Sequence, residues 1–141
     1  MNETLEMISC DVAPRPLGNY SHAVAFGNLV VVSGIGPRDP KTNEVPGLVL
    51  DSSGNKLKYD IQSETRLTLK TIEKILLKAG SSLEKVMEIQ VYLTNMGDFE
   101  AYNRVYSEFF TKHRPARTTI GVASLPGKIS IEMKALAVRS L

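Results

Sequence analysis

The chain is poor in cysteine and has no long apolar run. Cys10 is its only cysteine, and no stretch approaches the roughly 20 consecutive apolar residues that a helix needs to cross a bilayer. One thiol excludes an internal disulfide, and the acidic first residues lack the apolar core of a secretory signal. We therefore predict a cytoplasmic protein with no membrane partner, in which Cys10, with no histidine beside it in the sequence, is a bystander rather than a nucleophile.

The net charge is also small, and histidine is scarce. The net charge is only +2, and Lys and Arg are scattered rather than gathered into a basic stripe, which argues against a nucleic-acid partner. His22 and His113 have no second ligand at metal-binding spacing, so we predict no metal site. Gly34 and Gly36 lack the spacing and the lysine of a phosphate-binding loop, which excludes a nucleotide site. We expect no cofactor.

The length and the apolar pattern predict one α+β domain over residues 1–141. A Gly27-Asn28 turn between apolar runs predicts a hairpin, and Asp60 is a suitable N-cap for the first of two helices. The expected elements are strands at 22–26, 29–32, 45–50, 87–93, 118–124 and 129–138, and helices at 60–79 and from 98 to about 109, after an irregular segment 1–21.

This order predicts a mixed β-sheet with both helices packed on one face. The run Leu29–Val32 is apolar at every position, so we expect both of its faces to be covered. Many positions of the other sheet face are apolar, and exposing them to water would cost about 25 cal/mol per Å². We therefore expect self-association into a closed ring.

Two charged residues stand out near the C-terminus. Arg117 offers a planar fork that fits a carboxylate, and Glu132 lies in an alternating strand that we expect to neighbour the strand of Arg117. Together they could hold a small acid and a water molecule beside it. Taken alone, the residue pattern favours a surface or salt-bridge role for Arg117 and a solvated carboxylate for Glu132.

Several segments together resemble the RidA (YjgF) family of reactive-intermediate deaminases. They are Tyr20 after a Pro/Gly-rich lead, 31–34 (Val-Val-Ser-Gly), 92–96 (Tyr-Leu-Thr-Asn-Met), 114–119 (Arg-Pro-Ala-Arg-Thr-Thr), the Leu-Pro turn at 125–126 and the Ile-Glu strand. The resemblance implies a chorismate-mutase-like fold, a homotrimer with active sites in the clefts between subunits, and hydrolysis of an imine or enamine to ammonia and a keto acid.

The resemblance also assigns roles to residues. It implies that Arg117 grips the substrate carboxylate, that Glu132 positions the attacking water, that Tyr20 borders the pocket, and that the backbone around Ser33 and Gly34 lines it.

The chain departs from the family pattern at two places. Thr119 stands where the family often has cysteine, so activity attributed to that thiol does not transfer; we keep Thr119 as a substrate-binding candidate. The loop after Gly34 is altered and is followed by Arg38, which could meet a second carboxylate. The sequence looks closer to the 2-aminomuconate deaminase branch, whose substrate is a six-carbon dicarboxylate with an enamine.

The alternative is a non-catalytic trimer that binds small carboxylates or acts as a chaperone. The presence of both Arg117 and Glu132 favours the enzyme. A ribonuclease, proposed for some relatives, is a distant third because the charge is weak.

Overall fold

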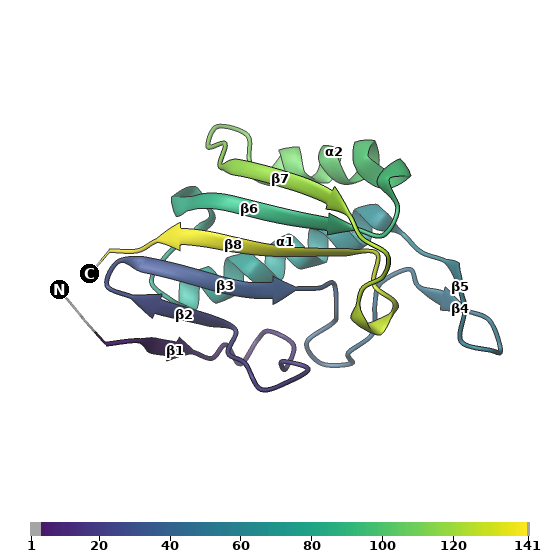
Figure 1. Ribbon diagram of the computed structural model, residues 1–141, viewed down its shortest axis with the longest axis horizontal. Helices are drawn as coiled ribbons and strands as arrows, with labels where there is room; N and C mark the ends of the chain where they lie inside the picture. The colour runs from purple at the N-terminus through teal and green to yellow at the C-terminus, as the bar shows by residue number, and fades with distance from the viewer. Residues whose placement is uncertain (1–3, 141) are drawn as a thin grey trace.

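The computed structural model describes residues 4–140, which form a mixed sheet backed by two helices (Figure 1). The six strands run in the order β1-β2-β3-β8-β6-β7. They are β1 (Glu6–Ile8), β2 (Ala23–Phe26), β3 (Leu29–Ile35), β6 (Val86–Leu93), β7 (Ala116–Gly121) and β8 (Ile131–Val138). The helices are α1 (Ile61–Lys78) and α2 (Phe99–Phe109), and β4 (Val49–Leu50) pairs with β5 (Lys56–Lys58) in a separate ladder. The predicted α+β class is confirmed.

Local sequence signals explain the elements that were predicted. Gly27 has a φ of 58°, which the tight turn between β2 and β3 requires. The Asp60 carboxylate accepts hydrogen bonds from the N–H groups of Gln62 and Ser63, and Gly80, with a φ of 85°, follows the end of α1. In α2, Tyr102, Val105 and Tyr106 form a buried stripe.

The core lies between the helices and one face of the sheet. Strand β8 alternates strictly, with Ile131, Met133, Ala135 and Ala137 buried. Strands β3 and β6 pair with β8 antiparallel, whereas β7 runs parallel to β6. In Figure 1 both helices lie behind the sheet, with α2 behind the β7 edge, so the front face carries no helix.

Four expectations are corrected. The segment 1–21 is not wholly irregular, because β1 pairs with β2. Strand β5 was not predicted, and β3 continues through Ile35 instead of ending near Val32. The run at Leu29–Val32 is covered on one face only: Leu29 and Val31 are 44% and 45% exposed in the single chain.

No helix within residues 4–140 has the length and apolar content that a bilayer span needs.

Candidate active site

A cavity of about 220 Å³ lies where β3 ends and β8 begins. Tyr20, Gly34, Arg38 and Glu132 line it together with Leu17, Gly18, Gly36, Pro126 and Ile129. The segment that precedes β2, the loop after β3 and the start of β8 therefore meet at one end of the sheet. Four of the residues predicted from the sequence share this cavity.

Glu132 is the carboxylate of this cavity. It is half-buried, and no hydrogen bond or ion pair joins it to another side chain within residues 4–140. Burial raises the pKa of its carboxyl group above the ordinary value of 4.5. Its place depends on Gly34: a β-carbon there would lie 2.5 Å from Oε2 of Glu132. A raised pKa and an unpartnered oxygen suit a group that takes a proton from water.

Tyr20 and Arg38 form part of the cavity wall. The N–H of Leu17 donates to the Tyr20 hydroxyl at 3.2 Å, and Tyr20 is 47% exposed, so its own proton remains available to a ligand. Arg38 donates to the side-chain oxygen of Asn43 and to the carbonyl of Arg15. These two bonds fix its guanidinium beside the cavity.

Ser33 supports the wall without lining the cavity. Its hydroxyl donates to the carbonyl of Ser21 at 2.6 Å, which ties β3 to the segment before β2. The predicted contact of the 33–34 backbone with a ligand therefore depends on Gly34, which does line the cavity.

Arg117 lies elsewhere, between β7 and α2. Its Nη1 donates to Oδ1 of Asn103 at 2.7 Å, and its guanidinium carbon lies 4.6 Å from the ring centroid of Tyr106 and 5.6 Å from that of Tyr102. Phe99 completes the aromatic platform at 5.7 Å. No carboxylate within residues 4–140 forms an ion pair with Arg117, so most of its N–H donors have no acceptor of their own.

Thr119 follows Arg117 on the same face of β7. The register pairs Arg117 with Ile89 and Thr119 with Val91, both of which point toward the helices. The Thr119 hydroxyl is hydrogen-bonded to the hydroxyl of Tyr102 at 2.5 Å.

The expected strand neighbourhood of Arg117 and Glu132 is wrong. Strand β6 separates β7 from β8, which places the two backbones roughly 9.6 Å apart. Glu132 pairs with Tyr92 on the face without helices, whereas Arg117 contacts α2 on the helical face. Within one chain, the two charges therefore lie on opposite faces of the sheet.

Sequence reasoning missed the residues that support both charges. Asn103, Tyr102 and Tyr106 hold Arg117. The spacing of Tyr102 and Tyr106 on one helix face is typical of a core stripe, and nothing in the sequence placed Asn103 beside Arg117. Buried Glu64 accepts a hydrogen bond from the N–H of Ser130 at 2.7 Å and so anchors the turn that leads into β8. Burial raises the pKa of Glu64. No local signal marked this carboxylate, which occupies a core-facing position of α1.

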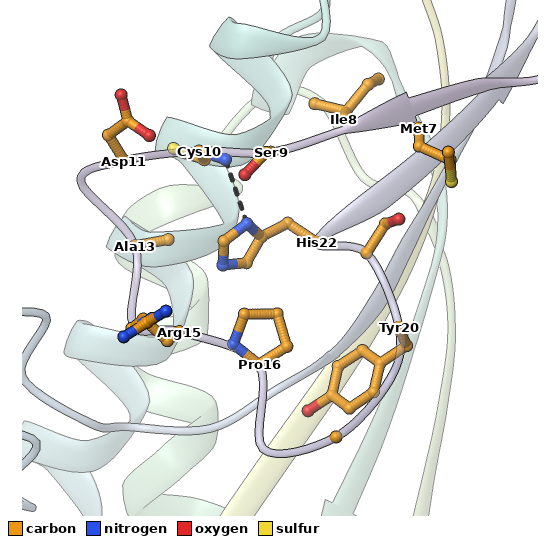
Figure 2. A pocket seen from close by; sticks show the side chains of 12 residues that line it. Met7, Ile8, Ser9, Cys10, Asp11, Ala13, Arg15, Pro16, Tyr20 and His22 are labelled. Atoms are coloured by element: carbon orange, nitrogen blue, oxygen red, sulfur yellow. Dashed lines mark hydrogen bonds between the residues drawn. The ribbon is translucent and has the colours of Figure 1, made fainter.

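A second cavity, of about 540 Å³, lies along residues 7–22 (Figure 2). It contains His22 and Cys10, but both ring nitrogens of His22 are engaged: Nδ1 accepts from the Cys10 N–H, and Nε2 donates to the carbonyl of Pro14. Cys10 is buried. Among the described residues, no group of three His, Cys, Asp or Glu side chains could hold a metal ion. The hydrogen bonds of His22 therefore leave neither ring nitrogen free to activate a nucleophile in this cavity.

The fold and these residues define an α+β protein with a carboxylate in a cavity and an arginine that has no ion-pair partner among residues 4–140. A family model described as Endoribonuclease L-PSP matches residues 10–139, and the chain belongs to this family, in agreement with the resemblance to RidA (YjgF). A RutC family protein of Pyrococcus abyssi is 39% identical over 95% of this chain and 97% of its own.

Solved structures of related proteins have the same fold over nearly the whole chain. Escherichia coli TdcF, provisionally named a reactive intermediate deaminase and crystallised with bound serine, is 33% identical, with a TM-score of 0.84 over 96% of this chain and 99% of its own. The E. coli YjgF gene product is also 33% identical, with a TM-score of 0.83 over the same shares of the two chains.

Proposed function

We propose that the protein is a deaminase that hydrolyses a small carboxylate-bearing imine or enamine, releasing ammonia and a keto acid. One observation carries this proposal: Arg117 and Glu132 are half-buried charges of opposite sign, and neither has an internal counter-charge among the described residues. Partly burying an unpaired charge destabilises a fold, so an unpaired cation and anion together indicate a ligand site. The provisional name of TdcF supports this class of reaction.

The complete site would lie between copies of the chain. Arg117 and Glu132 face opposite sides of one sheet and cannot reach the same small molecule. A second copy could bring its Glu132 cavity to the β7 edge of the first. We propose a homotrimer, in which a repeated head-to-tail contact closes and each cleft receives Arg117 from one subunit and Glu132 from the next.

The chemistry then follows from the two groups. The Arg117 fork binds both oxygens of the substrate carboxylate and fixes the imine carbon. Glu132 removes a proton from water as the oxygen attacks that carbon, and this proton passes to the nitrogen to give a carbinolamine. The carbon–nitrogen bond then breaks as the hydroxyl proton is transferred to the nitrogen, which leaves ammonia and the keto acid. Positioning of this kind can supply about 7–11 kcal/mol of the barrier in the best cases. An enamine must first gain a proton at carbon to become an imine.

We propose 2-aminomuconate as the particular substrate. Its second carboxylate would need a second cation, and Arg38 lies in the Glu132 cavity with its guanidinium fixed by Asn43 and Arg15. Serine bound to TdcF also carries a carboxylate beside a nitrogen, which supports recognition of this pair of groups.

The test is ammonia release from freshly generated 2-aminomuconate and from 2-iminopropionate, with the Arg117→Ala and Arg117→Lys variants beside the unaltered protein. We expect turnover of both compounds, with 2-aminomuconate faster, and a loss of about 100-fold or more in kcat/KM for Arg117→Ala. Arg117→Lys keeps the charge but not the fork, so it should recover only part of the rate. Full activity of Arg117→Ala would overturn the proposed site.

A carboxylate-binding protein without catalysis is the second candidate, because the unpaired Arg117 fork favours binding whether or not hydrolysis follows. Calorimetric binding of a carboxylate, with no ammonia from any imine tested, would identify it. The family description also names an endoribonuclease. The net charge of this chain is only +2, whereas RNA binding normally needs a strongly basic surface.

A further inference from the structure

Thr119 and Tyr102 form a hydroxyl pair beside Arg117 that the hydrolytic scheme leaves unused. We propose that Thr119 donates a hydrogen bond to the heteroatom on C2 of the ligand, the imine nitrogen of the substrate or the keto oxygen of the product, and that Tyr102 is the positioning residue that turns the Thr119 proton outward. This inference rests on the proposed carboxylate site at Arg117.

Burial of Tyr102 sets the direction of the hydrogen bond. Its side chain is 0% exposed, and within residues 4–140 its hydroxyl has Thr119 as its only hydrogen-bond partner. If Thr119 donated to Tyr102, the Tyr102 proton would be buried without an acceptor, at a cost of about 1–3 kcal/mol. Tyr102 therefore donates, and Thr119 accepts. Burial raises the pKa of the Tyr102 phenol, so that proton stays in place.

This direction leaves the proton of Thr119 free. Thr119 is half-buried rather than enclosed, and its hydroxyl has no acceptor among the described residues. Arg117 lies two residues earlier on the same face, with its guanidinium against the ring of the same Tyr102. One buried tyrosine thus orients both the cation and the neighbouring hydroxyl.

The ligand atom follows from the order of donors along β7. A bidentate arginine takes both carboxylate oxygens, so the next acceptor of a 2-imino or 2-keto acid is the heteroatom on C2. The next free donor on this face of β7 is Thr119. A hydrogen bond there would orient C2 for attack and would distinguish such acids from simple carboxylic acids.

The experiment compares two ligands by calorimetric titration. Pyruvate has the C2 oxygen, whereas propionate has the same carbon chain without it. For Thr119→Val we expect the Kd of pyruvate to rise about tenfold and that of propionate to change less than about twofold. Tyr102→Phe should raise the pyruvate Kd about threefold, because the Thr119 hydroxyl can then rotate, and Tyr102→Phe with Thr119→Val should be no worse than Thr119→Val alone.

Two matched variants complete the design. Thr119→Ser keeps the hydroxyl and should bind pyruvate within about twofold of the unaltered protein. Thr118→Val makes the same change on the opposite face of the same strand and should leave both Kd values unchanged. Equal losses for pyruvate and propionate would show that the pair only braces α2 against β7, which overturns the inference.

The outcome is separable from that of the proposed function. If the protein binds pyruvate but releases no ammonia from imines, the deaminase proposal fails, and the Kd pattern still decides the role of Thr119. If neither acid binds, the carboxylate site at Arg117 and the inference that rests on it both fall.

Discussion

Glu132 owes its position to the absence of a side chain at Gly34. A β-carbon at Gly34 would lie 2.5 Å from Oε2 and 3.0 Å from the carboxyl carbon of Glu132, so Gly34→Ala must displace the carboxylate. A displacement of about 1 Å can cost about 100-fold in rate. We expect such a loss in kcat for imine hydrolysis, with pyruvate binding at Arg117 nearly unchanged.

The comparison variant for this prediction is Gly36→Ala. Its β-carbon would be too close only to Cδ1 of Ile129, at 2.7 Å, and this atom is the far end of a side chain that can rotate, so the loss should be much smaller. Equal rates for Gly34→Ala and the unaltered protein would show that Glu132 does not need this placement.

Burial of Glu132 also predicts the acid side of the pH profile. Because burial raises the pKa of the carboxyl group above 4.5, the group is protonated at pH values where an ordinary glutamate is ionised. As general base it must be ionised, so kcat/KM should fall as the pH drops through this raised pKa. The fall should be centred above pH 4.5, and Glu132→Gln should be slow at every pH. A fall centred below pH 4.5 would contradict this assignment.

Among the elements, α1 has its N-terminus fixed by hydrogen bonds to the capping residue Asp60. Oδ1 of Asp60 accepts from the N–H groups of Gln62 and Ser63, and the Ser63 hydroxyl donates to Oδ2. Asp60→Ala should destabilise the protein by about 1 kcal/mol in denaturant unfolding at pH 7, whereas Asp60→Asn, also a good cap, should cost less.

The stability that Asp60 contributes depends on pH. Hydrogen bonds from the Ser63 hydroxyl and from backbone N–H groups lower the pKa of Asp60 below 3.8. The carboxylate therefore contributes its full stabilisation above that unfolded-state value and loses it as the pH falls through the lowered folded value. The difference between Asp60→Ala and the unaltered protein should shrink accordingly; a constant difference would exclude this linkage.

Elements with a local signature were predictable, and those defined by pairing were not. The hairpin at Gly27-Asn28 and both helices have turn, cap and periodic signals within a few residues. Strands β1 and β5, of three residues each, are too short to show a period. In β6, the register is irregular between Val86 and Glu88, where Val86 is buried and Met87 is exposed, so burial does not alternate regularly from the start of the predicted strand at 87.

The candidate site shows the same division. Arg117 and Glu132 were selected from their segments, but their separation by β6 depends on strand order, which follows from long-range pairing and was not deduced from the sequence. The support of Arg117 by Asn103 and Tyr102 likewise depends on how α2 packs beside β7.

In the whole molecule, one face of the sheet is covered by helices and the other is not. Helices cover one side of the sheet, while the other exposes Phe26, Leu29 and Val31, which are 44%, 44% and 45% exposed. Leaving this apolar surface in water costs about 25 cal/mol per Å². The two charges give a second reason for association, since Arg117 and Glu132 cannot reach the same small ligand within one chain. Association of copies would cover the apolar surface, and the proposed homotrimer would bring the two charges into one cleft.

This reasoning predicts complementation between inactive variants. Arg117→Ala and Glu132→Gln, co-expressed with different tags and purified by both tags in turn, yield mixed assemblies. In a closed ring of three that contains both variants, one interface combines an intact Arg117 with an intact Glu132, so about one third of the normal ammonia release should return. Arg117→Ala carrying both tags on separate chains should stay inactive. If the mixed assemblies form, as mass measurement can show, and still release no ammonia, then the two residues do not act across an interface.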